Sequence, residues 1–235
     1  GVNEPSFVED LESLARLAEQ QNAELLKTGE LTNATRELER HLQLVKKQPG
    51  ANRDLLSDLQ LTLGATQIKA GEHVEAAATY RETLKILSES NSETPERFNR
   101  AKHGLGMALV ELEEIDEAKA LFTEVLESSA SSSSKVPARI SLAKAMATTP
   151  SVATIEEAFN ILESGLDDEI TFEDRSRMIS ELAGLARAHG QTLQALVWEA
   201  RSAAAAGDLD QANHILNDLR QEYKSSSQFE PREAS

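Results

Sequence analysis

Cysteine is missing from this sequence of 235 residues. Its absence excludes disulfide bonds, thiolate zinc sites and cysteine nucleophiles. No run of about 18 apolar residues occurs either, so we expect no segment of this chain to insert directly into a membrane. Proline and glycine are not abundant, with six and eleven residues, which argues against collagen-like and low-complexity chains. Hydrophobic residues make up 40% of the sequence, enough for a folded globular protein with a sizeable core.

Basic residues are the minority charge. The sequence has 24 Lys and Arg against 40 Asp and Glu, which gives a formal net charge of −16. Such a charge repels a phosphate backbone or an anionic lipid surface unless a local basic stripe overrides it. The densest basic run is only Lys46-Lys47, with polar residues on both sides. We therefore expect no nucleic-acid partner.

Catalytic motifs are also missing. The five histidines lie far apart in the sequence, and none has the spacing of metal ligands. Carboxylate pairs such as Glu113-Glu114 lie in predicted turns, where acidic residues are normally solvated. There is no glycine-rich phosphate loop and no Gly-x-Ser-x-Gly motif. The sequence therefore predicts a protein that is not an enzyme and that carries no metal and no cofactor.

Helical periodicity runs along almost the whole chain. Apolar residues recur at spacings of three and four, and no segment alternates between apolar and polar residues for more than four positions. Ser6 and Thr171 each begin a capping box, and Thr94-Pro95 has the pattern of a helix start. We expect an all-α chain of ten or eleven helices. The predicted helices span about 6–28, 34–45, 55–69, 74–87, 96–112, 116–126, 137–146, 155–162, 171–189, 191–206 and 208–223.

A serine tract, residues 128–134, interrupts this pattern. Serine-rich segments are typical of flexible joints. The sequence therefore suggests repeats 1–3 in residues 1–127, a serine-rich linker at 128–135, degenerate repeats 4–5 with a capping helix at 136–224, and a flexible tail at 225–235. A loop is also expected at 165–169, after the eighth predicted helix.

The helices follow an internal period. Each of Ala34, Ala76 and Ala118 follows a turn, and successive alanines are 42 residues apart. Weaker copies centre on Ala158 and Ala195, at spacings of 40 and 37 residues. Repetition at such a period indicates stacked supersecondary units, each burying its apolar face against its neighbours.

Two further features recur with the alanines. Leu63-Gly64 and Leu105-Gly106 stand at one distance before Ala76 and Ala118. Leu38, Tyr80 and Phe122 each follow their alanine by four residues. A small residue lets two helices approach closely, and a large residue one turn later fills the gap to the next hairpin. We expect the single tryptophan, Trp198, to pack between the last helices in a similar way.

This pattern resembles the tetratricopeptide repeat (TPR) family over about residues 6–206. The long period is similar to that of kinesin-light-chain-like arrays. The resemblance implies a right-handed superhelical solenoid of antiparallel helix hairpins, with about five repeats and a C-terminal capping helix. The repeat register of the last helices stays open. The turn from Gly207 to Ala212 fits the same pattern, and in that case residues 197–206 form the first helix of a repeat instead.

In this family the first helices line a concave groove that binds a peptide or helix of a partner protein. The Lys and Asn clamp that some members use for carboxylate tails is absent here, so we expect a partly apolar ligand with basic flanks that complement the acidic chain. The resemblance places the following residues in the groove: Arg16, Glu19, Asp58, Leu61, Ala65, Ile68, Arg100, His103, Met107 and Val110.

The resemblance thus implies a protein–protein interaction scaffold. The alternative is a structural or oligomerisation module of a larger or membrane-anchored protein, with self-association as its output. The chain begins Gly1-Val2-Asn3 without methionine, so we expect a processed or shortened chain. The sequence leaves two compartments open. The chain is either cytoplasmic, or it is the extracytoplasmic soluble part of a protein whose N-terminal signal or anchor has been removed.

Overall fold

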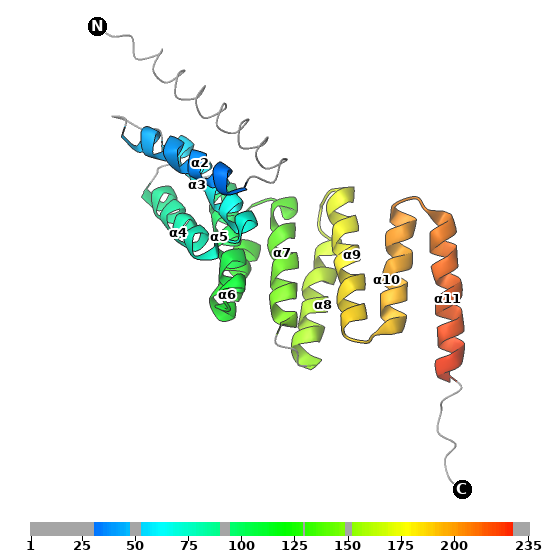
Figure 1. The fold of residues 1–235 in the computed structure, drawn as a ribbon. Helices are drawn as coiled ribbons and strands as arrows, with labels where there is room; N and C mark the ends of the chain where they lie inside the picture. The colour runs from blue at the N-terminus through cyan, green and yellow to red at the C-terminus, as the bar shows by residue number, and fades with distance from the viewer. Residues whose placement is uncertain (1–30, 48–52, 90–94, 129, 149–151, 228–235) are drawn as a thin grey trace. The chain divides into compact units, whose positions relative to one another are not determined.

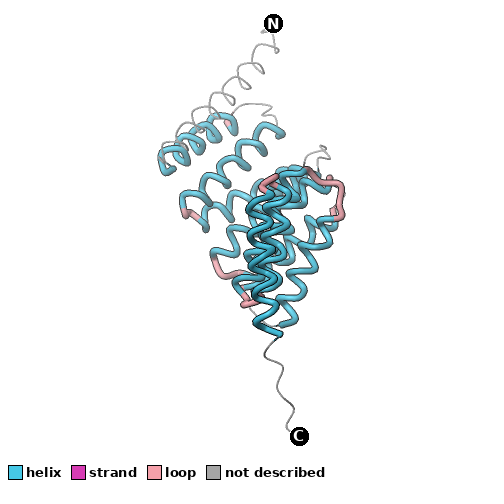
Figure 2. Tube along the Cα trace, turned by 90° about the vertical axis from the view of Figure 1, so that its right-hand side faces the viewer, coloured by secondary structure: helices cyan, strands magenta, loops and turns pink. Residues whose placement is uncertain are grey.

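The computed structural model describes residues 31–47, 53–89, 95–128, 130–148 and 152–227 (Figure 1). These residues form helices joined by short connections and include no strand, which confirms the all-α prediction (Figure 2). The predicted first helix and the caps at Ser6 and Thr94 lie outside the described residues. The helices are α2 (Leu31–Lys46), α3 (Arg53–Ala70), α4 (His73–Glu89), α5 (Pro95–Glu111), α6 (Ile115–Glu127), α7 (Ser132–Ala147), α8 (Val152–Leu166), α9 (Phe172–Ala188), α10 (Thr192–Ala205) and α11 (Leu209–Ser227).

The chain divides into two compact units, Gly1–Ala130 and Ser131–Ser235. In the first unit each of the helices α2 to α6 packs against the next, and α3 also contacts α5. In the second unit α7 to α11 pack in the same consecutive way, and α7 also contacts α9. In each unit one pair of alternate helices therefore touches, α3 with α5 and α7 with α9, as stacking of one hairpin on the next requires. None of the described helices is long and apolar enough to cross a membrane.

The repeat alanines of the first unit lie in its interior. Ala34, Ala76 and Ala118 have no exposed surface. The large residues four positions later, Tyr80 and Phe122 among them, are also buried. This burial confirms the packing reason that the sequence suggested for the recurring pattern.

Glycines of the first helices make room for the aromatic rings of the second helices. A Cβ atom built on Gly64 of α3 would lie 2.7 Å from Cζ of Tyr80, and one on Gly104 of α5 would overlap the same ring. A Cβ on Gly106 would likewise overlap Phe122. Tyr80 therefore fits between α3 and α5, because both helices have glycine, which lacks a side chain, where they face its ring.

The second unit keeps the pattern with smaller residues. Ala158 and Ala195 are buried, and Leu162 takes the place that Tyr80 has in the first unit. Trp198 is also buried, as predicted, and the guanidinium carbon of Arg201 lies 4.6 Å from its ring centroid. Thr171 caps α9, because its Oγ1 accepts a hydrogen bond from the backbone N–H of Asp174 at 3.1 Å.

Helix α7 begins earlier than the sequence predicted. The serine tract does not extend as a joint to residue 135, because α7 starts at Ser132 and takes up Pro137 in its second turn. Ser131 is the N-cap, and its side chain accepts a hydrogen bond from the backbone N–H of Ser134. Serine supports a helix start as readily as a flexible joint, which explains the error. The division of the repeats between the two units stays a prediction.

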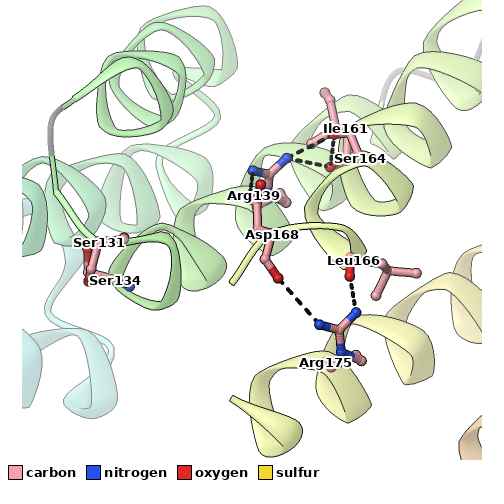
Figure 3. A network of polar contacts seen from close by, with 8 residues as sticks. All are labelled: Ser131, Ser134, Arg139, Ile161, Ser164, Leu166, Asp168 and Arg175. Carbon is pink, nitrogen blue, oxygen red and sulfur yellow. Dashed lines mark hydrogen bonds and ion pairs between the residues drawn. The ribbon is translucent and has the colours of Figure 1, made fainter. Parts of the chain in front are cut away.

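Helix α8 continues to Leu166, into the predicted loop, and two arginines from other helices hold its end (Figure 3). The guanidinium of Arg139 on α7 donates to Ile161 O at 3.0 Å and to Asp168 Oδ2 at 2.9 Å. Arg175 on α9 donates to Leu166 O and, at 3.3 Å, to Asp168 O. Positive groups at a helix C-terminus satisfy its last carbonyls and complement its dipole.

Leucine at either of the fully buried alanines, Ala76→Leu or Ala118→Leu, should overpack the contact between helices and lower the free energy of unfolding by about 1 to 3 kcal/mol. Urea unfolding followed by circular dichroism measures the loss. Ala78→Leu is the matched control, because Ala78 is exposed on the same helix as Ala76. Equal stability of all three variants and the parent chain would contradict the repeat packing described above.

Candidate functional site

A pocket of about 310 Å³ lies in the first unit, between α3, α4 and α5. The first helices of two successive hairpins form its walls, and the second helix between them contributes Tyr80. Its lining residues are Leu61, Ala65, Ile68, Lys69, Tyr80, Arg100, His103, Gly104 and Met107.

The pocket brings together six of the residues that the family resemblance placed in a groove. They are Leu61, Ala65, Ile68, Arg100, His103 and Met107. Asp58 and Val110 do not line it, and Arg16 and Glu19 lie outside the described residues. A role of these residues in binding stays a prediction.

Sequence reasoning missed three lining residues, Lys69, Tyr80 and Gly104. The repeat pattern predicts only a packing role for Tyr80, but its ring both packs against Gly64 and lines the pocket. Gly104 stands three residues before Met107 and one helical turn from Arg100, a spacing that puts it on the same helix face. That spacing could have identified it.

Asp58 of α3 forms an ion pair with Arg97 of α5, the first helix of the next repeat. Arg97 of α5 donates from Nε to Asp58 Oδ1 at 2.9 Å and from Nη2 to Asp58 Oδ2 at 2.8 Å. Its Nη1 also lies 3.1 Å from Asp54 Oδ1. The hydrogen bonds from Arg97 to Asp58, assisted by the charges of both aspartates, raise the pKa of Arg97 above its usual value. A forked pair of this kind fixes α5 against α3 at one end of the pocket.

The pocket has an apolar floor and a partly exposed rim. Leu61 is only 2% exposed, whereas Met107 is 38% exposed. Ala65 and Arg100 are exposed too. The imidazole of His103 packs against Phe122, with ring centroids 5.7 Å apart. A ligand would therefore meet Met107, Ala65 and Arg100 before it reached the floor.

The charged side chains in the lining are all basic. Lys69 and Arg100 carry positive charge, and among the residues that the structure describes no Asp or Glu lines the pocket. This contrasts with the net charge of the whole chain, −16. Among the described residues no group of three or more His, Cys, Asp or Glu is arranged to hold a metal ion. The arrangement offers apolar contact and positive charge within one small volume.

Burial of Tyr80 raises the pKa of its phenol to about 12, although the nearby charge of Arg100 acts in the opposite direction. Because this pKa exceeds the usual value of 10.0, the folded state is favoured while the phenol stays neutral, and this contribution is lost as the pH rises through the folded pKa. Stability should therefore fall by roughly 2 to 3 kcal/mol between about pH 10 and pH 12.

Urea unfolding at several alkaline pH values measures this fall. Tyr80→Phe removes the titrating group and keeps the ring, so it should show a shallower fall over the same range. A pH profile identical in the variant and the parent chain would show that another group carries the effect.

Comparison of folds finds several similar solved structures. TPR-like repeats of a putative kinesin light chain from Podosopora anserina align with a TM-score of 0.60 and 21% identity, covering 89% of this chain and 96% of that chain. BtubC (BKLC) from P. vanneervenii has a TM-score of 0.58 and 18% identity, covering 98% and 94%. Pseudomonas aeruginosa pilF has a TM-score of 0.57 and 16% identity, covering 92% and 94%. A comparison with curated protein sequences finds no significant match.

The family described as the tetratricopeptide repeat matches residues 194–226. This segment covers most of α10 and α11. The register of the last two repeats stays open, because Ala195 on α10 also continues the series of repeat alanines. The similar structures show the fold of the remaining helices, and they bear out the resemblance to long-period kinesin-light-chain-like arrays. The chain is therefore an all-α protein with the fold of tetratricopeptide-like repeats, and its residues 194–226 match the tetratricopeptide repeat family.

Proposed function

We propose that this protein is a protein–protein interaction scaffold and that the pocket between α3, α4 and α5 binds a peptide or helix of a partner. The TPR-like fold is typical of such scaffolds and is typically non-catalytic. One observation carries the proposal further: side chains from two successive first helices and from the second helix between them line the same pocket. Such a pocket can hold one side chain of a ligand while the rest of the ligand lies along the first helices.

The pocket chemistry suggests the kind of ligand. Leu61, Ile68 and Met107 offer apolar contact, while Lys69 and Arg100 offer positive charge. Net charge suggested basic flanks on the ligand, but charges farther away than about 8 to 10 Å are screened at physiological salt. The charged groups that line the pocket therefore determine which ligand charge is favoured. We propose a ligand with an apolar side chain beside a carboxylate, either an Asp or Glu side chain or the chain terminus.

Each part of this ligand has a place in the pocket. The apolar side chain would enter past Met107 and lie over Leu61, which is already shielded from water. Arg100 is exposed at the rim, where its guanidinium can form a forked hydrogen bond with a carboxylate. Tyr80 would supply a rigid wall, because its ring is wedged between Gly64 and Gly104. A preformed wall reduces the ordering cost of binding.

Selection of ligands from a random displayed-peptide library, with the full chain as bait, tests this function. We expect selected peptides to combine an apolar residue with an acidic residue or a free C-terminus. Met107→Asp and Arg100→Glu should each weaken binding of a selected peptide at least about tenfold in Kd, which corresponds to about 1.4 kcal/mol. Calorimetry or fluorescence anisotropy measures the change.

The matched control is Val74→Asp, which places the same charge on an exposed position of α4 outside the pocket. Leu61→Asp is not a clean test, because a charge at this buried position would destabilise the helices themselves. Selected peptides that bind Met107→Asp and Arg100→Glu as tightly as the parent chain would move the site elsewhere.

Self-association is the second candidate function. Leu209 and Leu216 lie on α11 and are 65% and 39% exposed. The two leucines are seven residues apart, so they share one face of the helix. An exposed apolar stripe on a terminal helix can pair with a second copy of the chain.

If this stripe mediates assembly, sedimentation velocity should show a dimer whose population grows with concentration, and Leu209→Glu with Leu216→Glu should return it to monomer. A parent chain that stays monomeric across the concentration range would exclude this function. The peptide-binding proposal does not depend on the outcome.

A further inference from the structure

The second unit has a pocket of about 360 Å³ between α7, α8 and α9. Its lining includes Ile140, Ala143, Lys144, Leu162, Glu181 and Gly184. From its residues and charge, we propose that this pocket is a second recognition site, which accepts an uncharged aromatic side chain of a protein partner. The proposal does not require the pocket of the first unit to bind anything.

The two pockets occupy the same place in the repeat. Ala143 stands 15 residues before Ala158, as Leu61 stands 15 before Ala76, and Leu162 follows Ala158 by four, as Tyr80 follows Ala76. On the next first helix, Glu181 and Gly184 stand 14 and 11 residues before Ala195. The corresponding residues before Ala118 are Gly104 and Met107. Both pockets are lined by these corresponding residues.

The substitutions between the pockets enlarge the second one. Leucine becomes alanine at Ala143, tyrosine becomes leucine at Leu162, and methionine becomes glycine at Gly184. A Cβ atom built on Gly184 would meet no atom within 4 Å, so this wall of α9 opens into space. A volume of 360 Å³ is within the usual range of ligand pockets, about 300 to 1,000 Å³. The repeat therefore keeps the pocket here with smaller side chains at three of the four corresponding positions. At the fourth, Glu181 replaces glycine, and its carboxylate pairs with Lys144.

The charge of the second pocket suggests an uncharged occupant. Lys144 Nζ and Glu181 Oε1 lie 2.7 Å apart at the rim, so the opposite charges neutralise each other. The hydroxyl of Thr148 donates to Ala145 O at 2.7 Å. The side chains of Lys144 and Glu181 are 62% and 28% exposed, so the pair itself is worth about 1 kcal/mol or less. Its two charges offset each other, so the rim offers no net attraction to a charged ligand.

An aromatic ring fits this combination best. Aromatic side chains bury the largest apolar area and lose little conformational entropy on binding. His189 is also among the lining residues. Leu162, Ile140 and Leu185 supply the aliphatic walls. The second unit would thus recognise shape and apolar area, while the first recognises negative charge.

N-acetyl-tryptophanamide, titrated into the full chain with labelled methyl groups, tests the proposal by nuclear magnetic resonance. We expect saturating shifts at the methyl groups of Ile140, Leu162 and Leu185, and no comparable shifts there with N-acetyl-lysinamide. Gly184→Leu should raise the Kd that these shifts measure at least tenfold, because the leucine side chain would fill the pocket. The melting temperature should not fall, since the added Cβ meets open space and leucine favours a helix over glycine.

Asn160→Leu is the matched control, because it adds the same side chain to an exposed position of α8 outside the pocket. Ala147→Leu, on the opposite wall, is a second filling variant and should act like Gly184→Leu. Three results would overturn the proposal: no saturating shift at these methyl groups, equal shifts with the lysine probe, or undiminished shifts in both filling variants. Met107→Asp and Arg100→Glu report on the first unit alone, so failure of one site is distinguishable from failure of the other.

Discussion

The first unit depends on one fit, the ring of Tyr80 between two glycines. The ring occupies the space above Gly64 of its own hairpin and Gly104 of the next. This single contact sets how closely α3, α4 and α5 approach, and it forms one wall of the pocket between them. Phe122 and Gly106 repeat the arrangement one hairpin later. Stability and the shape of the candidate site therefore rest on the same side chains, so a change that loosens one is expected to alter the other.

The hairpins were readable from the sequence because their signals are local. The period of Ala34, Ala76 and Ala118, together with turn glycines such as Gly71, predicted the helices of the first unit and their buried faces. Gly71 has a φ of 78°, a conformation that other residues adopt only with strain. The ends of α7 and α8 were less predictable. The start of α7 depends on the cap at Ser131, and the end of α8 depends on arginines from two other helices.

The site was predictable only in outline. Helical spacing and the family resemblance identified positions such as Ala65 and Met107, which do line the pocket. They could not show that Arg97 forms hydrogen bonds with Asp58, because these two residues lie on different helices and are 39 residues apart in the sequence. Nor could they show that the lining is basic in an acidic chain. Local charge follows from which residues converge in space, and composition carries no information about that convergence.

The end of α8 has a consequence for the way the second unit opens. Last turns of helices normally fray first, because their carbonyl groups lack partners within the helix. Here Arg139 and Arg175 reach the end of α8 from the helices on either side, and both contact Asp168 (Figure 3). Fraying of this turn would first have to break the hydrogen bonds that reach it from α7 and α9. Opening of this turn is thus coupled to contacts from both neighbouring helices, and the same three helices line the apolar pocket.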